Sequence, residues 1–149
     1  MKVPQGEFGD VEFTIEKEEW NEYRLSDGSK LKARAILTKL HRSKNPEPSL
    51  DSGGEVFAAY QTIMVVFSPL ELMGQPNVNN IVPEQMLDLK MEDIEVLDAD
   101  ERWNVYQIEK ENMKVKTKLV VSSIRRVEDR FTDDGTPLYL IGSSVVMGP

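Results

Sequence analysis

Apolar and polar residues alternate along several stretches of this chain, which is the pattern of strands with one face in a core and one in water. Residues 30–42 and 114–126 show it most clearly, and we predict a long strand at each place. Residues 56–67 and 138–147 are apolar on both faces, which predicts closing strands that are covered on both sides. The chain is therefore expected to be all-β, or mostly β.

Shorter elements are predicted before each long strand. Residues 11–15 and 94–97 are expected to be short strands. Gly28 and Asn112 supply the positive φ that tight turns before the two long strands require. Single turns of helix are predicted at the same point in both halves of the chain, at residues 16–19 and 98–102.

The two halves of the chain resemble each other. Trp20-Asn21-Glu22-Tyr23 is matched 83 residues later by Trp103-Asn104-Val105-Tyr106, and residues 31–42 match residues 115–126 position by position. The gaps between the copies fall in turns and loops, where a change of length is tolerated. We therefore predict an internal tandem duplication of a roughly four-stranded antiparallel meander.

The duplication sets the expected domain organisation. The predicted parts are unit 1 at residues 1–69, a linker at residues 70–81 that begins with a helical turn, and unit 2 at residues 82–149. Each unit alone is too small to bury a comfortable core. We expect the two to pack as one pseudo-twofold β-barrel or sandwich.

Composition limits the classes of function. The 149 residues contain no cysteine and carry a net charge of −8, so disulfides and thiolate metal sites are excluded and non-specific nucleic-acid binding is disfavoured. No apolar run is long enough for a membrane helix, and the N-terminus lacks the apolar core of a signal peptide. A cytoplasmic protein without a membrane partner is the expectation.

The first closing strand carries the leading functional hypothesis. A strand that is apolar on both faces is covered either by the other half or by another chain. We therefore expect a non-enzymatic binding or assembly module that contacts a protein partner or a second copy of itself. The residues expected at this interface lie on one face of the strand: Val56, Ala58, Tyr60, Thr62, Met64 and Val66.

Two rows of basic side chains carry an alternative hypothesis. Period-two spacing places three cations on one face of each long strand. They are Lys30, Lys32 and Arg34 in the first half, and Lys114, Lys116 and Lys118 in the second. Such rows would bind an anionic ligand or, less readily for an acidic chain, nucleic acid. The competing interpretation is a solvated face whose lysines pair with Glu12, Glu22, Glu95 and Glu109.

The aromatic residues of the matched motif are expected in the core. Trp20, Trp103, Tyr23 and Tyr106 recur at equivalent positions, which is more typical of core packing than of a stacking platform. The asparagine beside each tryptophan is expected to bond to nearby backbone.

Candidate chemistry is sparse. His41 is the single histidine, so a histidine metal site is not expected. The acids cluster at Asp98, Asp100 and Glu101 and at Asp133 and Asp134, without a calcium-loop spacing. A carboxylate-dependent enzyme is therefore the third and least favoured hypothesis, and we predict no catalytic residue, metal or cofactor.

Overall fold

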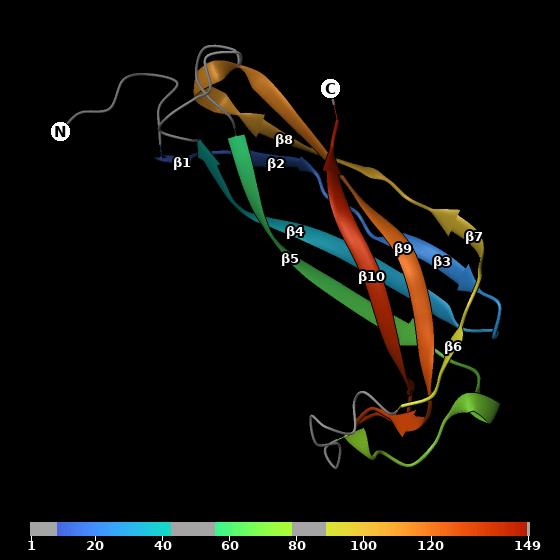
Figure 1. Cartoon of the computed structure of the whole chain (residues 1–149). Helices are drawn as coiled ribbons and strands as arrows, with labels where there is room; N and C mark the ends of the chain where they lie inside the picture. The colour runs from blue at the N-terminus through green and yellow to red at the C-terminus, as the bar shows by residue number, and fades with distance from the viewer. Residues whose placement is uncertain (1–8, 43–55, 79–88, 149) are drawn as a thin grey trace.

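The protein is an all-β sandwich of two antiparallel five-stranded sheets packed face to face (Figure 1). The computed structural model describes residues 9–42, 56–78 and 89–148. Those residues contain no α-helix, only short 3-10 turns such as Leu70–Leu72 (η1) and Glu109–Glu111 (η4). The prediction of an all-β fold is confirmed, and η1 is the helical turn expected at the start of the linker.

Each half of the chain contributes five strands. In the first half these are β1 (Gly9–Val11), β2 (Thr14–Lys17), β3 (Asn21–Leu25), β4 (Lys30–Arg42) and β5 (Val56–Phe67). In the second half they are β6 (Met91–Asp93), β7 (Val96–Asp100), β8 (Trp103–Ile108), β9 (Met113–Phe131) and β10 (Pro137–Met147). The turns before β4 and β9 contain Gly28 at φ 90° and Asn112 at φ 49°, as predicted.

The long strands β4 and β9 are the centres of the two sheets. In sheet A, β5 pairs with one side of β4 over its whole length, while β1 and β3 share the other side and β7 pairs with β3. In sheet B, β10 pairs with one side of β9, β6 and β8 share the other side, and β2 pairs with β8. The two sheets therefore have the same strand order.

Each sheet includes one strand from the opposite half of the chain. β2 of the first half completes sheet B, and β7 of the second half completes sheet A. This reciprocal exchange has the symmetry that an internal duplication predicts, and it means that neither half has a complete sheet of its own. The boundaries at residues 69 and 82 stay predictions.

The exchange explains where the predicted short elements were wrong. The single strand expected at residues 11–15 is two strands, because the chain leaves sheet A after β1 and enters sheet B at β2. The helical turns expected at residues 16–19 and 98–102 are wrong, since Thr14–Lys17 and Val96–Asp100 are strands. Both are exposed edge strands that contain charged residues, so they lack the apolar alternation of a half-buried strand.

The core lies between the sheets in two clusters. The larger joins Leu31 and Ala33 of β4 with Leu119 and Ile124 of β9, and the smaller joins Leu37 of β4 with residues of β8 and β9. The inward residues of β4 and β9 alternate with the basic ones. Burial of that alternate row is what places the lysines on the outer faces.

Buried polar side chains link the two halves reciprocally. The Nδ2 of Asn21 donates to the carbonyl of Leu119 at 2.7 Å, and its Oδ1 accepts from the backbone N of Arg102 at 2.9 Å. Asn104 makes the equivalent bonds to the carbonyl of Ala35 and the backbone N of Glu19, at 3.4 and 3.0 Å. The expectation of local backbone bonds is wrong, because both asparagines bridge the halves.

The tyrosines of the motif follow the same rule. The hydroxyl of Tyr106 donates to Glu18 at 2.7 Å, and that of Tyr23 donates to Glu101 at 2.8 Å. Both tyrosines are buried, as predicted. Burial, followed by the bond to a carboxylate, raises the pKa of each phenol above its ordinary value.

Candidate interaction surfaces

The outer strands of the two sheets differ in length and charge. β7 of sheet A and β2 of sheet B are short, fully exposed and charged, with Asp98 and Asp100 in β7 and Glu16 and Lys17 in β2. β5 and β10, at the opposite edges, have 12 and 11 residues and contain no charged side chain. Natural sheets blunt open edges with short strands and charges. Only two of these four edges are protected in that way.

The apolar side chains of β5 occupy both of its faces. The six residues predicted at an interface lie on the inner face. Five of them, Val56, Ala58, Tyr60, Met64 and Val66, are half-buried against the core clusters. The sixth, Thr62, lies opposite the buried Ala35 and is exposed.

The exposed apolar row of β5 is the alternate set of residues. Phe57 and Phe67 are 52% and 56% exposed, and Ile63 and Val65 are 37% and 38% exposed. This row lies opposite the basic row of β4, with Phe67 across from Lys30 and Val65 across from Lys32. The exposed apolar side chains of β5 are therefore those of its outer face.

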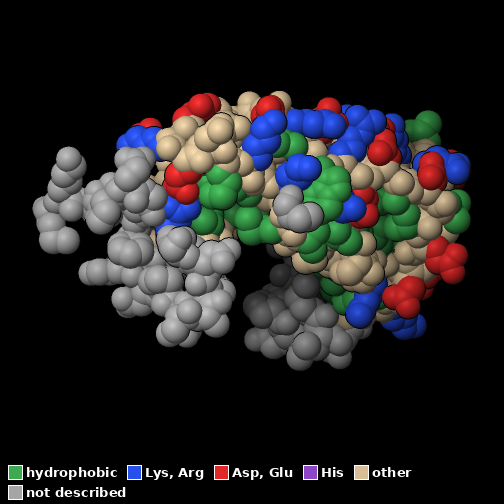
Figure 2. Space-filling view, turned by 90° about the horizontal axis from the view of Figure 1, so that it is seen from above, with side chains coloured by type: hydrophobic (Ala, Val, Ile, Leu, Met, Phe, Trp, Pro, Cys, Tyr) green, Lys and Arg blue, Asp and Glu red, His purple; other side chains and the backbone are tan. Residues whose placement is uncertain are grey.

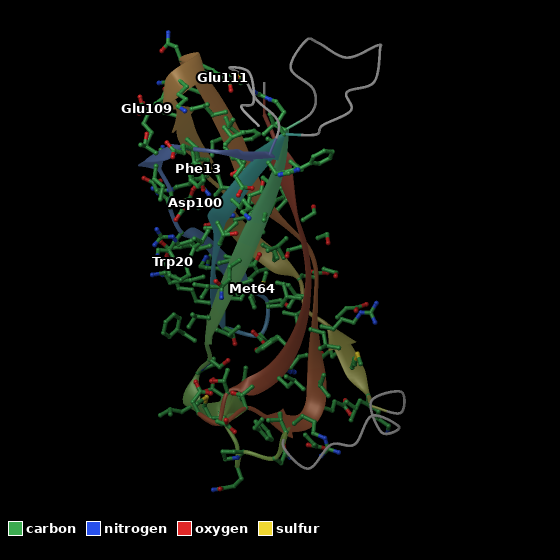
Figure 3. The ribbon with its side chains drawn as sticks, turned by 90° about the vertical axis from the view of Figure 1, so that its left-hand side faces the viewer. Phe13, Trp20, Met64, Asp100, Glu109 and Glu111 are labelled. Carbon is green, nitrogen blue, oxygen red and sulfur yellow. The ribbon has the colours of Figure 1, made fainter. Side chains whose placement is uncertain are left out.

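An open groove of about 450 Å³ separates the ends of β5 and β10. Its apolar lining comes from Met64 and Val66 on one side and from Tyr139 and Ile141 on the other. Figure 3 shows Met64 beside β5, on the side that faces β9 and β10. The two uncharged edges thus lie on the same side of the sandwich (Figure 1), and the groove between their ends is lined by these apolar side chains together with Thr132, Asp134 and Thr136.

A polar network fixes the β10 side of this groove. The hydroxyl of Tyr139 lies 2.5 Å from Asp27 and 2.9 Å from Ser29, which also contacts Ser68 at 2.8 Å. Asp27 accepts a further bond from Arg126 at 2.9 Å. Burial opposes the charge on Asp27, but these bonds outweigh it and lower its pKa. These contacts tie the β10 side of the groove to the turn between β3 and β4.

The two basic rows lie on the outer faces, as the alternation predicts, but they are partly neutralised. Lys30 pairs with Glu22 at 2.5 Å and Arg34 with the buried Glu18 at 3.1 Å. In the second row, Lys114 pairs with Glu16 at 3.0 Å rather than with Glu109. Figure 2 shows Lys and Arg gathered along one border of the molecule with acidic side chains among them.

Two further lysines of the rows, Lys32 and Lys118, lie over the tryptophans. The amine of Lys32 is 5.1 Å from the ring centre of Trp20, and that of Lys118 is 4.8 Å from Trp103. The prediction that the tryptophans fill the core is wrong. Trp103 is 37% exposed and Trp20 lies on the outer side of the sandwich (Figure 3). The pairing of β3 with β4 and of β8 with β9 turns the tyrosines inward. The tryptophans, three residues before the tyrosines, therefore lie on the outer faces.

The acidic clusters have structural partners. Asp100 pairs with Arg102 at 2.9 Å, and Glu101 turns inward to Tyr23. Asp134 accepts bonds from Thr132 and Thr136 in the β9–β10 turn, which lower its pKa to about 2. His41 is exposed beside Asp10. Within residues 9–42, 56–78 and 89–148, no group of three or more potential ligands is arranged to hold a metal ion.

Comparisons with known proteins identify no relative. No protein-family model matches the chain, and no match was found among curated proteins or solved structures. In the part of the chain that the structure describes, no helix has the length and apolarity to span a membrane.

Proposed function

We propose that this chain is a non-enzymatic assembly module whose contacts with another protein chain are made by the open edges of β5 and β10. The observation that carries the proposal is the contrast between the edges of each sheet. β2 and β7 are short and charged, while β5 and β10 are long and uncharged. Long, flat and apolar edges aggregate unless something covers them.

The outer face of β5 adds to the same surface. Phe57, Ile63, Val65 and Phe67 form an exposed apolar row along the open edge. A partner strand that pairs with β5 would cover these side chains as well as the backbone groups. Backbone hydrogen bonds would then contribute to affinity, and the apolar row would determine specificity for the partner.

The test compares two single lysine substitutions in sheet A. Ile63→Lys charges β5 at a side chain that is 37% exposed, and Val96→Lys charges β7 at one that is 39% exposed. The mass of the particle containing the chain is measured for the purified protein and in an extract of cells that make it. We expect a particle larger than the monomer. Ile63→Lys should disrupt this particle, and Val96→Lys should leave it intact. A monomer in both preparations, or equal effects of the two substitutions, contradicts the proposal.

A second candidate function is anion binding at the tryptophan–lysine pairs. The observation that favours it is the position of Trp20 and Trp103 on the outer faces, under Lys32 and Lys118. A cation above an exposed aromatic ring suits a ligand that has both an anionic group and a flat face. The net charge of −8 weighs against an extended polyanion.

Tryptophan fluorescence tests the second candidate, with a single-stranded oligonucleotide and inorganic polyphosphate as probes. Replacing Lys114, Lys116 and Lys118 with Glu should abolish binding that falls steeply with salt. Replacing Lys17, Lys39 and Lys110 with Glu makes the same change in net charge outside the rows and should preserve it. Equal losses in the two variants would show only a general charge effect.

A further inference from the structure

The open edges of β5 and β10 are matched to each other. Each is the outer strand of its sheet next to the central long strand, and the two have 12 and 11 residues. They occupy equivalent places in the two halves and flank one groove on one side of the molecule. A partner that covers this side must therefore present two uncharged strands about as long as these.

We propose that the partner is a second copy of this chain, docked so that its two open edges pair with β5 and β10. This inference rests on the proposed function and specifies its occupant. The net charge of −8 on each copy opposes association overall. The strands β5 and β10 contain no charged side chain, so two copies can approach along these edges without repulsion between like charges on the strands. A second copy also presents two uncharged edges of matching length.

The area of this side is adequate for a stable dimer. A 12-residue strand is about 40 Å long. Two sheets about 10 Å apart, each with a layer of outward side chains, are roughly 20 Å across. The side therefore presents roughly 800 Å² from each copy, which is the size of a standard specific interface.

Closure distinguishes this dimer from a fibre. Around a twofold axis the same surface is used by both copies, so all four open edges are covered together. Among the described strands, the dimer then exposes only β1, β2, β6 and β7 as sheet edges, and each of these is short and contains at least one charged side chain. The absence of charged side chains from β5 and β10 alone among the edge strands follows from such an arrangement.

The experiment measures the mass of the purified full-length chain by sedimentation over a wide concentration range at low and high salt. The wild type is expected at twice 17.0 kDa, about 34 kDa, at both salt concentrations. Ile63→Lys with Val146→Lys charges β5 and β10 at side chains that are 37% and 40% exposed. The dissociation constant should rise by at least about 100-fold, because like charges then face each other in the interface.

The matched control places the same two charges on the protected edges. Ile15→Lys with Val96→Lys charges β2 and β7 and should leave the dimer intact. Hydrogen exchange on the wild type provides a measurement that needs no variant, since the backbone amides of β5 and β10 should become more protected as concentration rises.

Four outcomes overturn the second copy as partner. They are a monomer at every concentration, an open series of larger particles, protection that is independent of concentration, and equal dissociation of both lysine pairs. If the purified chain is a monomer but forms a larger particle in the extract that Ile63→Lys disrupts, the occupant is a different protein and the proposed function stands. If the extract also contains only the monomer, both fail.

Discussion

Arg42 binds Glu111 through two hydrogen bonds of 2.7 Å, from Nη1 and Nη2 to the two carboxylate oxygens. The arginine ends β4, and the glutamate lies in the turn between β8 and β9, close to that end in Figure 3. Arg126 of β9 makes the reciprocal pair with Asp27, in the turn between β3 and β4. Each long strand is thus tied to the hairpin turn of the other half, β4 at its last residue and β9 at a residue within the strand.

Removing Glu111 should destabilise the fold substantially. Arg42 has 4% of its side chain exposed, so Glu111→Gln leaves a nearly buried guanidinium without its counter-charge. We expect a loss of about 2–4 kcal/mol in the free energy of unfolding, measured with urea. Glu22→Gln is the control, because its pair with Lys30 is exposed and should contribute less than about 1 kcal/mol. Equal losses would contradict this account of the buried pair.

The two bridging asparagines should be equally important. Asn21→Ala and Asn104→Ala each remove one buried and one partly buried hydrogen bond and leave a carbonyl and an N–H of the other half without this partner. Each should cost about 2–4 kcal/mol in denaturant unfolding. A large loss in one variant and none in the other would show that the two halves are not energetically equivalent.

Stability should fall in acid because two carboxyls, those of Glu111 and Asp27, accept hydrogen bonds that favour their charged form. The hydrogen bond from Arg42 lowers the pKa of Glu111, and the pKa of Asp27 is also lowered. A carboxyl with a lowered pKa in the folded state contributes stability above its ordinary pKa of about 4. That contribution is lost as pH falls through the folded value.

Urea unfolding between pH 7 and pH 2 tests the acid effect. The wild type should lose stability below about pH 4, and Glu111→Gln should lose less over the same interval because it has one such carboxyl fewer. Parallel curves for the two proteins would exclude Glu111 as a source of the acid sensitivity.

Gly74 should not tolerate a side chain. Its backbone N donates to the carbonyl of Gly135 at 2.9 Å, and a methyl group on Gly74 would lie 2.5 Å from the ring of Phe131. Gly74→Ala should lower stability by about 1–3 kcal/mol in thermal or urea unfolding. Gly142→Ala serves as control, since the nearest atom there is the rotatable Oγ of Ser123. A neutral Gly74→Ala would mean that Phe131 can move aside.

The sequence predicted the elements whose apolar pattern is strong. The strands β4, β5, β9 and β10, the turn at Gly28 and the turn at Asn112 all follow from alternation and positive φ. The exchanged strands β2 and β7 were predicted only in part, since they overlap the short strands expected at residues 11–15 and 94–97. Their partners could not be predicted, because each pairs with a strand of the other half of the chain.

The predicted interface on β5 stays a prediction, and its six residues lie on the inner face of the strand. β5 is apolar on both sides, so its composition does not fix which row turns inward. The outward basic row of β4 would show which row of β5 turns outward if the register between the two strands were known. In the structure Val65 lies opposite Lys32, so the row that contains Val65 is the outer one. The long connection between these strands leaves that register undetermined from sequence.

The strand exchange also has a consequence for synthesis of the chain. Lys17 of β2 pairs with Val105 of β8, which is synthesised 88 residues later. The pairing of β3 with β7 spans a similar number of residues. Neither sheet can be completed during translation of the first half, so its apolar strands remain uncovered until most of the chain has emerged. Folding is therefore a late event dominated by distant contacts, and a product truncated before β8 would lack the partner of β2.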